Sequence, residues 1–170
     1  MPETTEQNEL MLRLENTIKA VVNDAAGPLL QLMDIVSKSI SVTLNGDKPM
    51  GKSLLTMDEL YALAIKIPVE CVYLQTTVNE FQTSQMLGDI VTENKITEHI
   101  VDMYGSKGDA KERLRRAELL EGESILQLTY RKQIARELQA IIDRADKVYE
   151  GVKKVIDAKS KEGNFDNKMQ

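Results

Sequence analysis

The chain has 170 residues, which is the length of one domain and enough for a sizeable core. Aromatic residues make up only 4% and charged residues 29%, and there is no Trp, so the composition argues against a globular α/β core and favours long helices with narrow apolar seams. The formal net charge of −5 argues mildly against indiscriminate binding to nucleic acid.

Cysteine usage and the N-terminus bear on the compartment. Cys71 is the only cysteine, so no intramolecular disulfide can form, and its apolar neighbours predict a small core residue. Met1–Thr4 lacks the basic-then-apolar order of a signal peptide, and no apolar run approaches the ~20 residues that span a bilayer. We therefore expect a cytoplasmic protein without a membrane partner.

Residues 1–41 are predicted to form an N-terminal helical segment, in which residues 1–8 are expected to be frayed. A first apolar face comprises Met11, Leu14, Ile18, Val21 and Ala25, at the 3-and-4 spacing of an amphipathic helix. Gly27-Pro28 should interrupt this helix, because proline lacks the amide donor. A helical face resumes to about Ser41 with Leu29, Leu32, Met33, Val36 and Ile40.

Residues 42–55 are predicted to be a connector loop. Asn45-Gly46-Asp47 and Pro49 indicate turns, and Val42–Leu44 is a candidate for a short extended piece. The run Gly46–Ser53 also matches the phosphate-loop pattern G-x-x-x-x-G-K-S. A phosphate loop requires a buried strand before it and a helix after it, inside a parallel sheet, and this sequence predicts no such sheet. We therefore expect a Gly/Pro-rich connector, with a nucleotide-hydrolysing enzyme as the weakest hypothesis.

Residues 56–162 are predicted to form a long helical hairpin, whose first helix starts at a capping box of Thr56 and Glu59. Its apolar stripe comprises Leu60, Leu63, Ile67, Cys71, Leu74, Val78 and Phe81, and Pro68 should kink or split the helix. Beyond Phe81 the stripe thins around Gly88 to Met86, Ile90, Ile96, Ile100 and Met103.

The turn of this αα-hairpin is expected at residues 104–109, with Asp109 as the N-cap of a last helix over about 110–161. That helix carries a heptad row of Ala135, Leu138, Ile142, Ala145, Tyr149, Val152 and Ile156, beside a second row of Ile134, Ile141, Val148 and Val155. Gly122 and Gly151 are candidate bends, and residues 163–170 are expected to be a disordered tail. A helix of about 75 Å is too long to bury its seam within one compact monomer. The predicted fold class is therefore an all-α, oligomeric long-helix bundle.

Nothing in the sequence favours catalysis. His99 is the sole histidine and is expected on a helix surface, because a zinc site or catalytic triad requires partners that one histidine and one remote cysteine do not supply. Carboxylate pairs such as Asp58-Glu59 lie in charge-rich, exposed sequence. We expect no enzyme activity, no cofactor and no metal.

The charge is distributed unevenly along the chain. Residues 1–106 hold 7 basic and 15 acidic residues, net −8, whereas residues 107–170 hold 15 basic and 12 acidic residues, net +3. One interpretation is a solvated helix laced with i,i+4 pairs such as Glu112–Arg116, Asp143–Lys147 and Glu150–Lys154. The other is a binding surface for an anionic polymer around the turn, where Tyr104 is placed to stack on an unpaired base. Its candidate residues are Tyr104, Lys107, Lys111, Arg113, Arg115, Arg116, Arg131 and Lys132.

Over roughly His99–Lys161 the chain resembles the UvsY-type recombination mediators of tailed phages. The resemblance rests on the turn Tyr104-Gly105-Ser106-Lys107-Gly108-Asp109 after a helix, a charged segment, and a second long helix ending in the apolar-plus-basic run Val152–Ser160. It implies a ring-forming helical protein, in the host cytoplasm if phage-encoded, that binds single-stranded DNA and helps to load a RecA-like recombinase while displacing a single-strand-binding protein. Lys107 would then face the DNA. The family's basic residues before the turn correspond here to Glu98–Asp102, which is acidic or apolar, so DNA contact would begin at Lys107.

Two hypotheses from different classes therefore lead. The first is a non-catalytic, homo-oligomeric recombination mediator that binds single-stranded DNA through the hairpin tip. The second is a structural or assembly protein, such as a small-terminase-like or scaffold-like helical oligomer, whose charges only keep it in solution. Salt-sensitive binding of an oligonucleotide separates the two.

Overall fold

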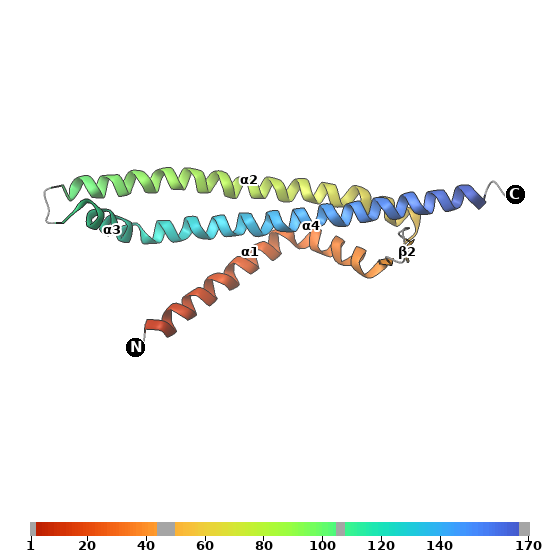
Figure 1. The fold of residues 1–170 in the computed structure, drawn as a ribbon, viewed down its shortest axis with the longest axis horizontal. Coiled ribbons are helices and arrows are strands. Elements are labelled where there is room, and N and C mark those ends of the chain that lie inside the picture. Colours follow the sequence, from red (N-terminus) through yellow and green to blue (C-terminus); the bar gives the residue numbers. More distant parts are fainter. Residues whose placement is uncertain (1–2, 44–49, 105–107, 167–170) are drawn as a thin grey trace. The chain divides into compact units, whose positions relative to one another are not determined.

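The computed structural model describes residues 3–43, 50–104 and 108–166. These residues form helix α1 (Glu3–Ser39), strands β1 (Ile40–Thr43) and β2 (Met50–Ser53), and helices α2 (Met57–Asp102), α3 (Ala110–Leu120) and α4 (Gly122–Asp166), as Figure 1 shows. Apart from the short strand pair, the described chain is helical, which confirms the all-α class.

The chain divides into two compact units. Unit 1 comprises Met1–Val21 and Thr77–Glu137, and unit 2 comprises Val22–Thr76 and Leu138–Gln170. Helices α1, α2 and α4 contribute residues to both units, so each unit is described by itself below.

The core of unit 2 follows the predicted seams of α2 and α4. Leu60 and Ile67 of α2 and Leu138 and Val152 of α4 are fully buried, and Leu29 of α1 is buried with them. Cys71 is also buried, as predicted, and burial raises the pKa of its thiol. Of the two heptad rows in α4, every residue is buried except Tyr149, Val148 and Ile156, which are half-buried. A helix with two buried rows contacts more than one neighbour.

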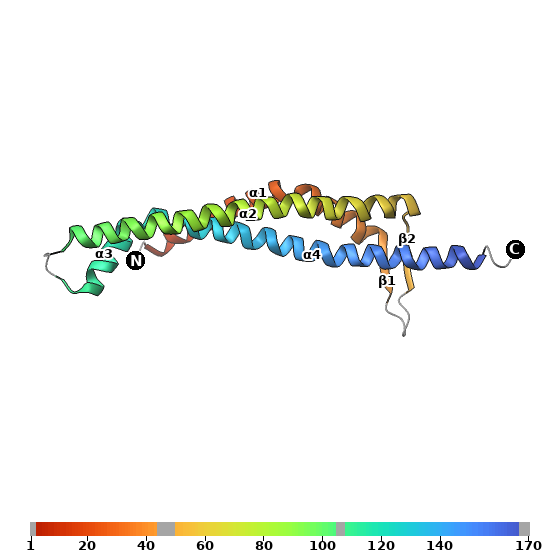
Figure 2. The same cartoon turned by 90° about the horizontal axis from the view of Figure 1, so that it is seen from above.

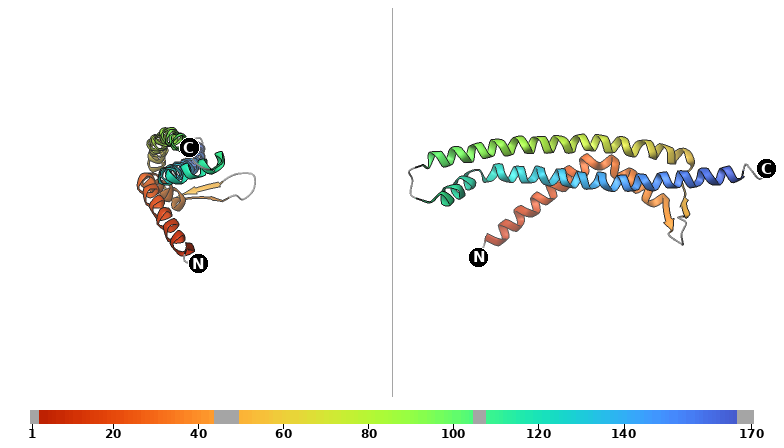
Figure 3. Two further views of the ribbon diagram at one scale, coloured as in Figure 1. Left: turned by 90° about the vertical axis from the view of Figure 1, so that its left-hand side faces the viewer. Right: turned by 45° about the horizontal axis from the view of Figure 1, so that its top comes forward.

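Strands β1 and β2 of unit 2 replace most of the predicted connector loop. They pair antiparallel from Ile40↔Ser53 to Thr43↔Met50, and Leu54 N donates to Ser39 O at 3.0 Å. Figures 2 and 3 show the two strands side by side, pointing away from the helices of unit 2. The prediction of a single short extended piece at Val42–Leu44 was therefore incomplete, because a second strand four residues long closes the hairpin. Residues 44–49 lie outside the described residues.

The predicted capping box opens α2. Thr56 N donates to Glu59 Oε2 at 2.8 Å, and Glu59 N donates to Thr56 Oγ1 at 3.3 Å. The backbone hydrogen bond from Thr56, followed by its hydroxyl, lowers the pKa of Glu59. Lys159 Nζ donates to Leu55 O at 2.6 Å, which ties α4 to the residue before this cap.

Neither helix-internal proline ends its helix. Pro28 lies inside α1, so the predicted interruption at Gly27-Pro28 is wrong. Pro68 lies inside α2, so of the two alternatives expected there, a kink or a split, the split is excluded. In a long helix one missing amide donor removes a single hydrogen bond, while the packed face on both sides is retained. The buried residues of α1 are Ile18, Val22, Ala26, Leu29 and Val36, whereas Met11 and Ala25 of the predicted first face are exposed.

In unit 1, α2 packs against α3 and the start of α4 with the chains running in opposite directions. Ser84 contacts Arg131, Gly88 faces Leu128, and His99 contacts Glu121, so positions rise along α2 as they fall along its neighbours. Figures 1 and 3 show these helices side by side. A Cβ on Gly88 would overlap Leu128 Cδ2, so the glycine permits the close approach of the two helices here.

This part of α2 turns its polar side inward. Thr92 is buried, whereas Met86 and Ile90, two residues of the predicted apolar stripe, are exposed. The stripe prediction beyond Phe81 was therefore wrong at these two positions, because the α2 positions that face α4 here are Ser84 and Gly88. Exposed apolar side chains on a helix are more informative than exposed polar ones, since they indicate a face without its partner.

The predicted single last helix is two helices. α3 ends at Leu120 and α4 begins at Gly122, so the predicted bend at Gly122 coincides with a break at Glu121, while α4 continues through Gly151. Residues 163–166, predicted as part of a disordered tail, continue α4 to Asp166; residues 167–170 lie outside the described residues.

Candidate nucleic-acid interface

The start of α3 is fixed by its cap. Asp109 has extended backbone angles, and its Oδ1 accepts a hydrogen bond from Glu112 N at 2.7 Å, which confirms Asp109 as the N-cap. Gly108 precedes it with a φ of +139°, a conformation that strongly favours glycine. The sequence Gly108-Asp109 therefore sets where the helix begins and how the chain enters it.

Tyr104 and Arg113 meet at this end of unit 1. The guanidinium carbon of Arg113 lies 5.8 Å from the centroid of the Tyr104 ring, within cation–π range. Arg113 Nη1 also donates to Gly108 O at 3.2 Å, so its guanidinium is held against the turn. Tyr104 nonetheless remains 83% exposed, so most of its ring faces solvent.

The other predicted site residues on α3 differ in whether their charges are paired. Arg116 forms an i,i+4 ion pair with Glu112, as the sequence predicted. Lys111 and Arg115 are exposed on α3, and in the described part of the chain neither forms an ion pair or a side-chain hydrogen bond. These two cations, four residues apart on one face of α3, are the most available of the predicted set. Lys107 lies outside the described residues.

Arg131 and Lys132 both lie on α4, but their side chains have different surroundings. Arg131 Nη1 donates to Ser84 Oγ at 2.8 Å, so this half-buried side chain joins α4 to α2. Lys132 is exposed and lines a shallow groove together with Asp89 and Glu93 of α2. These two acidic neighbours reduce the positive potential at Lys132.

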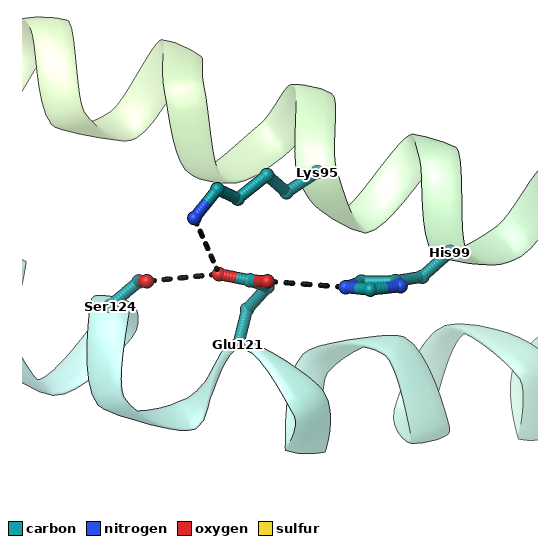
Figure 4. A network of polar contacts seen from close by, with 4 residues as sticks. All are labelled: Lys95, His99, Glu121 and Ser124. Atoms are coloured by element: carbon teal, nitrogen blue, oxygen red, sulfur yellow. Dashed lines mark hydrogen bonds and ion pairs between the residues drawn. The ribbon is translucent and has the colours of Figure 1, made fainter.

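A polar network lies at the junction of α3 and α4, and Figure 4 shows its four side chains. The carboxylate of Glu121 contacts His99 Nε2 at 3.1 Å, accepts from Ser124 Oγ at 2.9 Å and lies 3.7 Å from Lys95 Nζ. The hydrogen bond from Ser124, then that from His99, lowers the pKa of Glu121. Glu121 is buried, and the contacts of its carboxylate join α2 to the α3–α4 junction.

Sequence reasoning did not find this network. His99 was expected on a helix surface, whereas it is half-buried and paired with Glu121, a residue that no sequence pattern had singled out. The bend predicted at Gly122 was the only sequence signal near this network. A helix break at that position places Glu121 between the end of α3 and the start of α4. His99 and Glu121 are 22 positions apart in the sequence, with the predicted turn between them, so local spacing does not relate them.

The residues that match the phosphate-loop pattern are not arranged as in a nucleotide-binding site. Gly51, Lys52 and Ser53 lie in β2, and Lys52 pairs with Ser41 of β1. In a phosphate loop the Lys and Ser open a helix, so that the helix N-terminus faces the phosphates. Here the next helix, α2, begins only at Met57.

Within the ranges that the structure describes, no group of three or more His, Cys, Asp or Glu side chains is placed to hold a metal ion. Among the same residues, no helix combines the length and apolar composition needed to cross a membrane. No protein-family model, curated protein or solved structure matches the chain.

Proposed function

We propose that this chain is a non-catalytic, homo-oligomeric helical protein that binds single-stranded DNA at the end of unit 1 formed by Tyr104 and α3. The observation that carries the proposal is the exposed Tyr104 ring with the Arg113 guanidinium over it. Aromatic rings bind single-stranded nucleic acid by stacking on bases, and arginine adds a cation–π contribution. A duplex hides its bases from such a ring, so the proposal specifies single strands.

Two exposed cations supply the phosphate contacts in this proposal. Lys111 and Arg115 share a face of α3 and carry no competing ion pair in the described chain. A patch of this size binds weakly by itself, and the net charge of −5 opposes it. Repetition of the patch around an oligomer raises the affinity, because several sites then engage one strand.

The recombination part of the proposal comes from the resemblance to UvsY-type mediators. In that role the DNA-bound oligomer assists the loading of a RecA-like recombinase and the displacement of a single-strand-binding protein. The opposite directions of α2 and α3–α4 in unit 1 support the αα-hairpin on which the resemblance depends.

Fluorescence anisotropy of a labelled oligo-dT at several salt concentrations tests DNA binding. For single strands, log K falls with log salt by about 0.7 for each phosphate neutralised, so Lys111→Ala with Arg115→Ala should reduce the slope by about 1.4 for each subunit that contacts the strand. Lys147→Ala with Lys154→Ala is the matched control, because both lysines are exposed on α4 and their loss changes the net charge equally. An equal effect of the two double variants, or no binding by the natural chain at low salt, would contradict the proposal.

Tyr104 is tested in the same assay. Stacking of a base on an aromatic ring contributes about 1–3 kcal/mol, so Tyr104→Ala should weaken binding by roughly fivefold to a hundredfold. Tyr104→Phe keeps the ring and should bind like the natural chain. If Tyr104→Phe weakens binding as much as Tyr104→Ala, the hydroxyl rather than the ring face makes the contact, and the stacking argument is wrong.

An assembly protein is the second candidate, and exposed apolar side chains on α2 favour it. In unit 1 these are Met86, Leu87, Ile90, Val91 and Val101. A structural oligomer, scaffold-like or small-terminase-like, would cover such residues with another subunit and would show no salt-dependent binding to oligo-dT. Oligomerisation without DNA binding at low salt would select this candidate.

A further inference from the structure

Helix α3 carries the cations of the candidate interface but has few buried apolar side chains. All 11 of its residues lie in the described part of the chain, and of these only Ala117 is buried. Its leucines Leu114, Leu119 and Leu120 have exposed fractions of 41%, 73% and 64%. A helix of this length is marginally stable in water unless other elements hold it. The polar contacts at its two ends therefore matter for its position.

The contacts at the N-terminal end of α3 are local. Asp109 Oδ1 accepts from Glu112 N at 2.7 Å, and Arg113 Nη1 donates to Gly108 O at 3.2 Å. Each of these hydrogen bonds joins residues at most five positions apart. The Tyr104 ring that Arg113 approaches is itself 83% exposed. These contacts set where α3 begins, but they do not fix the helix against α2.

The C-terminal end of α3 is joined to α2 by Glu121, the residue after the helix. Its Oε1 lies 3.1 Å from His99 Nε2, and its Oε2 lies 3.7 Å from Lys95 Nζ and accepts from Ser124 Oγ at 2.9 Å. Figure 4 shows Lys95 and His99 extending from α2 toward the carboxylate. Each oxygen of this buried carboxylate therefore contacts a side chain of α2.

We propose that Glu121 is a positioning residue that holds α3 against α2, and that α3 is released from α2 when this carboxylate is lost. A carboxamide has a single acceptor oxygen, so Glu121→Gln turns an NH2 group toward one of the two sets of partners. With Ala117 as the only buried residue of α3, little apolar area opposes the release. Lys111 and Arg115 then lose the fixed placement that contact with DNA requires.

Hydrogen exchange of the full chain without DNA measures the release of α3. Glu121→Gln should lower the protection of the α3 amides about tenfold, because a hydrogen bond to a charged group is lost. The α2 amides between Leu60 and Leu74, in the buried seam of unit 2, should keep their protection, which separates local release from loss of the fold. Unchanged protection of α3 would overturn the proposal whether or not the protein binds DNA.

The effect on DNA binding rests on the proposed function, and its sign separates positioning from simple electrostatics. Glu121→Gln removes one negative charge, so a charge effect alone would tighten binding to oligo-dT. Release of α3 weakens binding instead, because the apparent affinity falls with the fraction of chains in which α3 is docked. Glu118→Gln is the matched control, because Glu118 is exposed on α3 and its loss changes the net charge equally. This control should bind no more weakly than the natural chain, and equal changes in the two variants would overturn the positioning role.

His99 tests whether the contact with α2 is the cause. His99→Ala breaks the contact from the α2 side and should also lower the protection of α3. Because both changes break one contact, the double variant with Glu121→Gln should lose little more protection than Glu121→Gln alone. Additive losses would overturn the proposal. Loss of α3 protection by Glu121→Gln, in a protein whose natural chain does not bind oligo-dT, would overturn the proposed function and support the anchoring of α3 by Glu121.

Discussion

Glu121 is a buried carboxylate that ends one helix and begins the next. Its backbone N donates to Ala117 O at 3.2 Å, and its backbone O accepts from Ile125 N at 3.0 Å. Its side chain meanwhile contacts His99, Ser124 and Lys95 (Figure 4). One residue therefore satisfies groups at both helix ends and joins them to α2.

The lowered pKa of Glu121 makes a signed prediction for stability. A carboxyl group whose pKa falls below its ordinary 4.5 on folding stabilises the folded state above that pH, and this stabilisation is lost as the pH falls through the folded pKa. Glu121→Gln should therefore be less stable than the natural chain at pH 7, with the difference shrinking below pH 4.5. Urea denaturation at pH 7 and at pH 3.5 measures both differences. A difference that stays constant with pH would show that the charge of Glu121 is irrelevant.

At the scale of elements, whether an apolar row of a helix is buried depends on the element that the row faces. In α4 both apolar rows were placed correctly, because Leu138 and Ile141 face apolar neighbours and burial follows their period. In α2 the same rule failed at Met86 and Ile90, because the positions that face α4 there are Ser84, which accepts a hydrogen bond from Arg131, and Gly88, which faces Leu128. Periodicity identifies an apolar face, but only the neighbouring element decides whether that face is covered.

Caps were predictable for a different reason. Thr56 with Glu59, and Asp109 before α3, satisfy backbone donors within three residues, so the whole interaction is visible in the local sequence. The contact of Lys159 with Leu55 O spans 104 positions and has no local signal. At the candidate site, likewise, the N-cap at Asp109 was predicted from the local sequence and the pairing of Arg131 with Ser84 was not.

The cap of α3 carries a prediction for stability. Asp109→Ala removes the acceptor for Glu112 N and should destabilise the protein by about 1 kcal/mol. Asp109→Ser keeps a capping oxygen and should cost only a few tenths of that. Chemical denaturation measures the change, and hydrogen exchange should locate the loss of protection in α3. Equal destabilisation by both variants would mean that the cap is not the cause.

At the scale of the whole molecule, stability should reside in the buried seams. Leu138 is fully buried, so Leu138→Ala should lower the free energy of unfolding by about 2–5 kcal/mol. Leu119 of α3 is 73% exposed, and Leu119→Ala should change it by less than about 0.5 kcal/mol. Denaturant titration of both variants makes the comparison, and similar losses would contradict the assignment of the core.

Photocross-linking tests the central claim most directly, because it reports which residue touches the DNA. An oligonucleotide carrying 5-iodouracil is bound to the full chain, irradiated and digested with trypsin, and the cross-linked peptide is sequenced by mass spectrometry. The account predicts a cross-link at Tyr104, in the tryptic peptide of residues 96–107. A cross-link at another aromatic residue, such as Tyr61 or Tyr73, with Tyr104 unlabelled would contradict it.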